Sequence, residues 1–274
     1  MILKILIVLI LLFTPFLGYA KEAESCQWDG YKKVVWIDDF EQISTGMAYP
    51  APSDLFIRRL TPMMDQGDRL IVDHRLNHLD WPDIHKAKLD AQIIVTAKLL
   101  VSNFSSETSL FGAEYGGKTT VNLQIYIFDN FSKTNIRSIN FEGSKRLFPI
   151  IFSNSQINQH DQMMDIIGDL LPNIARTLSS ELNCIPYATR VSVINANELI
   201  ISGGIRNNIQ PRMSFSILAD SDKGLGSIHS QHETIIFKKL SEAVIYSVSP
   251  SISFAKSPVN IGQFYKTLIA TPTP

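Results

Sequence analysis

Short apolar runs separated by helical patterns organise the first half of the chain. Residues 33–40, 69–73 and 91–101 are rich in Val, Ile and Leu, a composition typical of buried strands. Between the first two runs, Ser53 or Asp54 can cap a helix whose apolar positions are Leu55, Phe56, Leu60, Met63 and Met64. Pro62 is expected to end or bend this helix early. A short helix or turn is expected around 81–83.

A hairpin and a long helix follow. Residues 119–128 alternate apolar and polar side chains, as do residues 135–141 after a turn at 130–134, which predicts a β-hairpin. Asp161 is expected to cap the clearest helix of the chain, and Pro172 to kink it. Its apolar stripe consists of Met163, Ile167, Leu170, Leu171, Ile174, Leu178 and Leu182. We expect this stripe to pack on a sheet; the alternative is a helix that binds a partner.

After Pro186 the pattern changes to short strands separated by Gly, Asn and Pro. Strands are predicted at 190–194, 198–202, 213–218, 235–240 and 243–248, a spacing that favours a small β-barrel. Residues 220–233 are expected to form a long loop. The predicted fold class is therefore α+β, with a mixed-sheet α/β domain at 26–186 and a barrel at 187–274.

The first twenty residues have the pattern of a secretory signal peptide. Lys4 precedes an apolar stretch from Ile5 to Phe13, and 18–20 supply small residues before a cleavage site. A retained membrane anchor is the alternative, but the apolar stretch is short for a bilayer span. The sequence before Cys26 does not fit a lipidation signal. We therefore expect a periplasmic protein, peripheral rather than transmembrane.

Charge and motifs give little support for chemistry. The 25 Lys and Arg residues nearly balance the 26 Asp and Glu residues and form no blocks, so nucleic acid is not an expected partner. Residues 112–119 match the phosphate-loop pattern, which requires a helix directly after its lysine. An alternating strand is predicted there instead, so neither a nucleotide nor any other cofactor is expected.

A catalytic or metal site is not predicted either. His74, His78 and His85 lie near Asp73, Asp80 and Asp83, but their spacing lacks a zinc-binding arrangement, and we interpret them as a strand end and a solvated helix. No serine-nucleophile motif is present. Asp38 and Asp39 are neighbours at a strand end, where they are expected to meet nearby donors rather than act as an acid–base pair. We expect a protein that is not an enzyme.

The order of elements carries a resemblance to known families. Strand 34–40, a helix, the strand ending at 70–73, residues 90–97, the hairpin and the long helix together resemble the envelope α/β module of the Tol translocation protein B N-terminal domain. In the second half, residues 190–194, 198–204 and 208–217 resemble the SH3-like C-terminal barrel of flagellar assembly protein T. The chain thus resembles the middle and C-terminal domains of that family.

This resemblance implies a non-catalytic role in the flagellar basal body. Family members belong to the H ring, support outer-ring formation and assemble the stator ring, which implies flagellar ring proteins at the outer-membrane or peptidoglycan level as partners and a possible ring oligomer. The family's N-terminal domain has no counterpart in residues 26–28. The alternative is a general periplasmic adapter that binds peptidoglycan or a lipoprotein. The candidate contact surfaces are the edge strand of the mixed sheet and the loop at 220–233.

The two cysteines of the chain predict a disulfide between Cys26 and Cys184. Closing a loop of roughly 150 residues is worth about 5 kcal/mol in the chain-entropy model. Titration of the unfolded, unreduced protein with a thiol reagent should therefore detect no free thiol, and two after reduction. Two thiols before reduction would support the alternative of two buried free cysteines.

Overall fold

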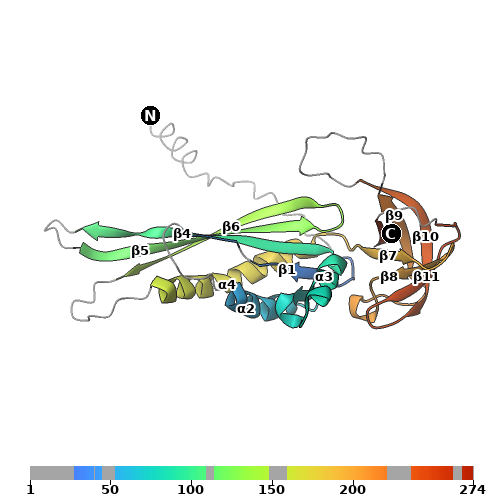
Figure 1. Cartoon of the computed structure of the whole chain (residues 1–274), viewed down its shortest axis with the longest axis horizontal. Coiled ribbons are helices and arrows are strands. Elements are labelled where there is room, and N and C mark those ends of the chain that lie inside the picture. The colour runs from blue at the N-terminus through green and yellow to red at the C-terminus, as the bar shows by residue number, and fades with distance from the viewer. Residues whose placement is uncertain are drawn as a thin grey trace, which may run out of the picture.

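Two structural units follow one another along the chain, a mixed sheet with helices and then a closed barrel. The computed structural model describes residues 28–39, 41–44, 53–108, 114–147, 159–220, 236–261 and 267–273. In Figure 1 the long strands of the sheet extend to one end of the molecule and the barrel lies at the other. The predicted α+β class, with the barrel second, is confirmed.

The sheet combines parallel and antiparallel strands in the order β3-β1-β4-β5-β6. Parallel pairing joins β1 to β3 and β4, and β2 also runs parallel to β4, whereas β4, β5 and β6 are antiparallel. The strands are β1 (Lys33–Ile37), β2 (Glu41–Ser44), β3 (Leu70–His74), β4 (Ile93–Thr108), β5 (Glu114–Asp129) and β6 (Thr134–Leu147).

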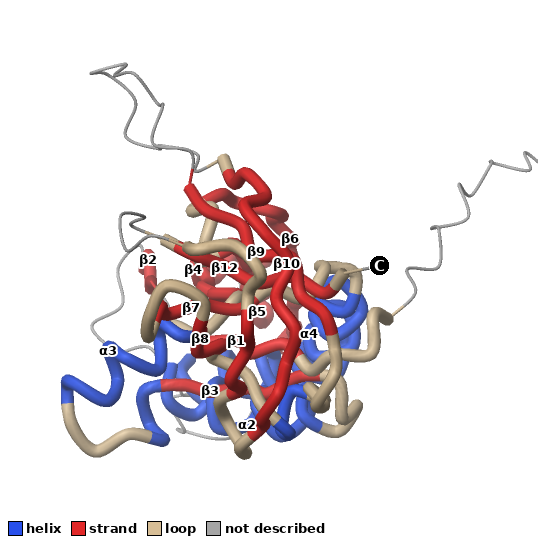
Figure 2. Tube along the Cα trace, turned by 90° about the vertical axis from the view of Figure 1, so that its right-hand side faces the viewer, coloured by secondary structure: helices blue, strands red, loops and turns tan. Residues whose placement is uncertain are grey.

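Two helices cover one face of the sheet. Helices α2 (Ser53–Asp65) and α4 (Gln159–Asn183) form a single core with the inward side chains of β1, β4 and β5. The alternation predicted for β5 is confirmed, because Val121, Leu123, Ile125 and Ile127 are all buried. Helix α3 (Trp81–Asp90) lies apart from α2 and α4 in Figure 2 and contacts β1 and β3.

The second unit is a closed barrel with the strand order β10-β11-β8-β7-β12-β9. Its interior is filled by small, branched and aromatic side chains, among them Leu199, Ile201, Phe215, Ile217 and Ala243. The strands are β7 (Thr189–Val193), β8 (Glu198–Ile201), β9 (Ser214–Asp220), β10 (Phe237–Val248), β11 (Ser253–Lys256) and β12 (Leu268–Pro272).

Several predicted boundaries are wrong. Helix α2 does not end early at Pro62 but continues to Asp65, because Leu60 and Met64 on either side of the proline are buried in the core; the alternative of a bend stays a prediction. Helix α4 begins at Gln159, so Asp161 lies inside it rather than capping it. The two strands predicted at 235–240 and 243–248 are one strand, β10, with a bulge between Lys239 and Ser241. Strands β11 and β12 were not predicted.

Some predicted features fall outside the described residues. Cys184 follows α4 and enters a disulfide bond, but Cys26 lies outside them, so the Cys26–Cys184 pairing stays a prediction. The proposed signal peptide and residues 221–233 of the expected loop also lie outside. Within the part of the chain that the structure describes, no helix is long and apolar enough to cross a bilayer.

The segment 28–33, which leads into β1 and includes its first residue, connects the two units. Its backbone exchanges hydrogen bonds with the barrel: the side-chain amide of Asn207 donates to Lys32 O at 2.9 Å, and that of Asn208 to Gly30 O at 2.9 Å. Tyr31 stacks on Tyr187 with ring centroids 5.0 Å apart and belongs to the barrel core. We call this segment the clasp, since it ties the start of the sheet to the barrel.

Buried polar groups reinforce the clasp. Lys33 is fully buried; its ammonium lies 3.4 Å from Asp29 and donates to Asn183 O at 3.2 Å. Burial lowers the pKa of Lys33, and the Asp29 carboxylate opposes this shift. The same carboxylate accepts a 2.6 Å hydrogen bond from Tyr187 N. Gln92 donates to Pro186 O at 2.6 Å and accepts from Ala188 N at 3.1 Å, so its amide binds both sides of the linker.

Replacing Asp29 is therefore expected to weaken the whole protein. Asp29→Asn leaves the buried Lys33 ammonium without a counter-charge and should lower the unfolding free energy by about 2 kcal/mol. The matched control is Asp68→Asn, which removes the partner of Lys32 at a highly exposed site and should have no measurable effect. Urea unfolding measures both, and equal midpoints for the two variants would contradict the role of the clasp.

Candidate functional site

Helix α3 contacts β1 and β3 but does not pack closely on the sheet. None of its side chains is buried, although amphipathic helices usually bury one face. Polar contacts at its two ends hold it in place. At the N-terminus, the Asp80 side chain accepts a hydrogen bond from Asp83 N at 3.2 Å, and a proline occupies the first turn. The space between helix and sheet is a cavity.

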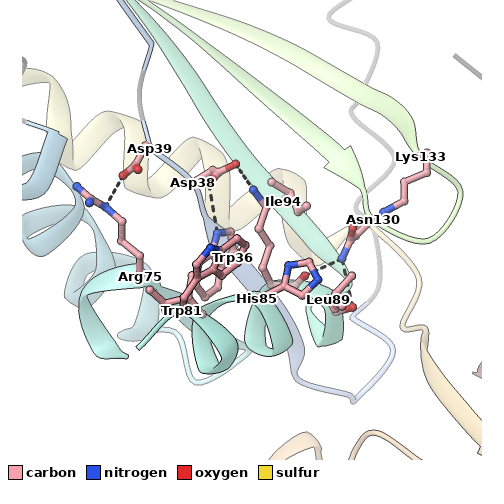
Figure 3. A pocket seen from close by; sticks show the side chains of 12 residues that line it. Trp36, Asp38, Asp39, Arg75, Trp81, His85, Leu89, Ile94, Asn130 and Lys133 are labelled. Atoms are coloured by element: carbon pink, nitrogen blue, oxygen red, sulfur yellow. Dashed lines mark hydrogen bonds and ion pairs between the residues drawn. The ribbon is translucent and has the colours of Figure 1, made fainter. Parts of the chain in front are cut away.

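This cavity, the α3 pocket, has a volume of about 370 Å³, within the range of small-molecule sites. It lies between α3 and the sheet, next to Trp36 of β1 and Ile94 of β4, and strands, helix and hairpin turn all contribute to it, as Figure 3 shows. Its lining comprises Trp36, Asp38, Asp39, Arg75, Trp81, Ile84, His85, Lys88, Leu89, Ile94, Asn130 and Lys133.

Aromatic side chains form the floor and the mouth of the pocket. Trp36 of β1 is 1% exposed and stacks on His78 with centroids 5.9 Å apart. Trp81 opens the helix, is 67% exposed, and meets the His85 ring edge-on at 5.1 Å. Leu79, two residues before Trp81, is also fully exposed. Large exposed apolar side chains beside a cavity are typical of a binding surface.

The acidic side chains of the pocket are already engaged. Asp38 lies 2.6 Å from the Lys88 ammonium, and Asp39 lies 2.6 Å from Arg75, as the sequence predicted for carboxylates that meet nearby donors. Arg75 also binds Asp54 at the start of α2 at 2.5 Å. These ion pairs hold the helix and the strand ends together across the pocket.

Asn130 fixes the C-terminal end of α3. It is buried in the β5–β6 turn, and its side-chain amide donates to Lys88 O and Ala91 O, both at 2.8 Å. These are carbonyls that a helix end leaves without partners. Its side-chain oxygen accepts a 2.7 Å hydrogen bond from the Lys133 ammonium. The turn is thus attached to the helix and brings Lys133 to the pocket.

The histidines and aspartates that lie close together in the sequence at 73–85 do not gather at one site. His78 Nε2 lies 2.9 Å from Asp73, whereas His74 is buried, which lowers its pKa, and His85 points to the pocket. Across the ranges described above, no three His, Cys, Asp or Glu side chains are placed to hold a metal ion.

The phosphate-loop match lies on a strand. Glu114–Thr119 belong to β5, where Gly117 is paired with Ser106 of β4 and Leu147 of β6. The backbone after Lys118 continues as strand, as predicted, so these amides do not form a helix N-terminus for a phosphate. Residues 112 and 113 lie outside the described part.

The α3 pocket itself was not predicted from the sequence. A signal is present, however: Trp81, His85 and Lys88 recur at i, i+4 and i+7, which places an indole, an imidazole and an amine on one side of a helix. A helix with this face and no apolar stripe has no means of packing closely on a sheet. The combination of this polar and aromatic face with the lack of an apolar stripe is the sequence signal for the site.

Removing the Asn130 side chain should release α3. Asn130→Ala leaves two buried carbonyls without donors and is expected to lower the unfolding free energy by about 2 kcal/mol. The control is Asn135→Ala, an exposed asparagine at the start of β6, which should change stability little. Hydrogen exchange of the α3 amides should rise selectively in the first variant. Unchanged protection of α3 would show that other contacts hold the helix.

Comparisons with known proteins give distant similarities. No protein-family model and no curated protein matches the sequence. Among solved structures, the hypothetical protein CT253 from Chlamydia trachomatis is 13% identical, with 56% of this chain and 98% of that chain covered and a TM-score of 0.36. Lipoprotein GNA1162 from Neisseria meningitidis is 11% identical, covering 54% and 98%, with a TM-score of 0.29.

A minor lipoprotein from Acinetobacter baumannii is 16% identical, with 55% of this chain and 94% of that chain covered and a TM-score of 0.30. Each likeness extends over little more than half of this chain. At such TM-scores neither the fold nor the function of this chain follows from these similarities.

Proposed function

We propose that this chain is an exported adapter protein of the bacterial envelope, which acts by binding and not by catalysis. The observation that carries the proposal is the α3 pocket, where a helix is held away from its sheet and an exposed tryptophan stands at the mouth. The N-terminal pattern of a signal peptide supports export to the periplasm.

The side chains of the pocket support binding. Both carboxylates, Asp38 and Asp39, are held in ion pairs, and His85 meets the edge of an indole ring. Among the described residues, no hydrogen bond joins His85 to an acid that would orient it as a general base. Such a site can recognise a ligand without transferring a proton.

The rigid connection between the two units suits an adapter. The clasp and Gln92 fix the barrel relative to the sheet, so two surfaces of one chain keep a constant separation. One surface is the α3 pocket, and the other is on the barrel or the edge strand β6. Peptidoglycan or a lipoprotein is the partner we propose for such an adapter.

Flagellar assembly is a second candidate function. A mixed-sheet unit followed by a closed barrel is the order that the resemblance to flagellar assembly protein T implies. On this proposal the partners are the ring proteins of the basal body, and the adapter supports the H ring and the stator ring.

Photocrosslinking in cells tests the binding role. A photoreactive phenylalanine analogue replacing Trp81 should give discrete adducts with an envelope protein or with peptidoglycan. The matched position is Ile205, an exposed apolar residue of the barrel unit that lies outside the pocket, where these adducts should be missing. The same adducts at both positions, or retention of the chain in the cytoplasm, would refute the proposal.

Electron microscopy of basal bodies separates the two candidates. If cells lacking this gene have no outer ring and do not swim, and the intact gene restores both but Trp81→Ala does not, the adapter acts in the flagellum. Unchanged rings and normal swimming leave the general envelope adapter.

A further inference from the structure

At the end of the α3 pocket next to the hairpin turn, not every positively charged side chain is paired with an acid. The Lys133 ammonium donates to the neutral side-chain oxygen of Asn130, and among the described residues it forms no ion pair. Lys88 lies on the adjacent turn of α3 and shares its charge with Asp38. Figure 3 shows Asn130 between the helix and Lys133.

A third cation reaches this place from the barrel. Arg190 of β7 lies over the Phe131 ring of the hairpin turn at 5.8 Å, and its buried Nε has no hydrogen-bond partner. The Lys133 side chain is exposed at the surface, yet partial desolvation lowers its pKa, and the charges of Arg190 and Lys88 lower it further. Mutual repulsion of this kind is relieved by a bound anion.

The nearby acids offset this excess only in part. Asp129 raises the pKa of Lys133, but its carboxylate is occupied by the turn, where it accepts hydrogen bonds from Phe131 N at 2.8 Å and Ser132 N at 3.2 Å. Asp90 at the end of α3 is partly buried, which raises its pKa, whereas the charges of Arg190 and Lys86 lower it. Asp90 therefore offsets part of the Arg190 charge, although among the described residues it forms no ion pair with Arg190.

The backbone at Lys133 has an unfavourable conformation. Its φ of 59° lies in the left-handed region, where a residue other than glycine or asparagine costs about 1 kcal/mol. Glycine would relieve this cost and is common at such turn positions. The ammonium that the lysine brings to the pocket is a reason for tolerating it.

The chemistry of the pocket favours a carboxylate among the possible anions. A neutral sugar is disfavoured as a ligand, because its hydroxyl groups need hydrogen-bond acceptors as well as donors. The two carboxylates that could accept, Asp38 and Asp39, are already bound to Lys88 and Arg75. A phosphate dianion is disfavoured, because the C-terminal end of α3, with its partial negative charge, adjoins this part of the pocket. Trp36 and Ile94 provide an apolar floor for a side chain next to a single negative charge.

We propose that the α3 pocket binds the C-terminal carboxylate of a peptide, with Lys133 as its principal partner, Lys88 beside it, and the Trp36 and Trp81 rings against the terminal side chains. This inference rests on the proposed binding role of the pocket and specifies its ligand. A cell-wall stem peptide and the C-terminus of a protein share this chemistry.

Calorimetric titration with four peptides tests it. The probes are acetyl-Gly-Ala-Ala with both alanines D or both L, each as the free acid and as the C-terminal amide. We expect an acid to bind at least about tenfold more tightly than its amide, the effect of one charge-assisted hydrogen bond. Preference for the D-acid would indicate a stem peptide, and preference for the L-acid a protein terminus.

Two lysine variants complete the design. Lys133→Gln should abolish the preference for the acid while leaving the affinity for the amide unchanged. Lys86→Gln removes the same charge from an exposed position of α3 outside the pocket and should keep the preference. Urea unfolding verifies that both variants fold.

Failure of this inference can be told from failure of the binding role. Equal affinities for acid and amide would overturn the carboxylate assignment, and so would binding of none of the peptides. In either case, crosslinks from position 81 in cells would still establish the pocket as a binding site. Loss of both the peptide binding and the crosslinks would refute the two proposals together.

Discussion

Polar groups buried at the junction of the two units constrain the rest of the structure. Lys33, Gln92 and Asn207 are each buried, and each finds hydrogen-bond partners on a segment far away in sequence. Removing the partner of a buried polar group lowers the free energy of unfolding by a large fraction of the total stability of a domain. The barrel can therefore not rotate against the sheet without leaving these groups without partners, so the hydrogen bonds fix the relative position of the units.

That fixed position affects the charge beside the α3 pocket. Arg190 belongs to the first strand of the barrel, yet it packs on Phe131 in the turn of the sheet hairpin. The same turn carries Asn130, which holds α3 by its carbonyls. Helix, hairpin and barrel are thus linked through one turn, and a movement of the barrel would change the charge around Lys133. The lining of the pocket comes from the sheet unit, and the barrel acts on it only through the charge of Arg190.

Local patterns predicted the elements better than they predicted what holds the elements together. Period-two alternation identified β5 and β6, and the apolar stripe identified α4, because burial of one face is written into neighbouring residues. Strands β11 and β12 were missed, being four and five residues long. The clasp could not be foreseen, since Asp29 meets Tyr187 across more than half of the chain. Hydrogen bonds between residues so distant leave no periodic trace in a sequence.

The difference between local patterns and tertiary contacts also explains which sequence patterns correspond to a candidate binding site. Residues 112–119 match a phosphate loop letter by letter, but pairing of β5 with both neighbouring strands occupies the amides that would hold a phosphate. Trp81, His85 and Lys88 match no named motif, yet a helix that buries nothing places them around a cavity. A sequence motif can bind a ligand only if the backbone that carries it has the right conformation. The position of α3 is therefore better evidence for a binding site than the sequence match at 112–119. Both carboxylates of that cavity are paired with cations, whereas Lys133 forms no ion pair among the described residues, and this imbalance is the basis for proposing an anionic ligand.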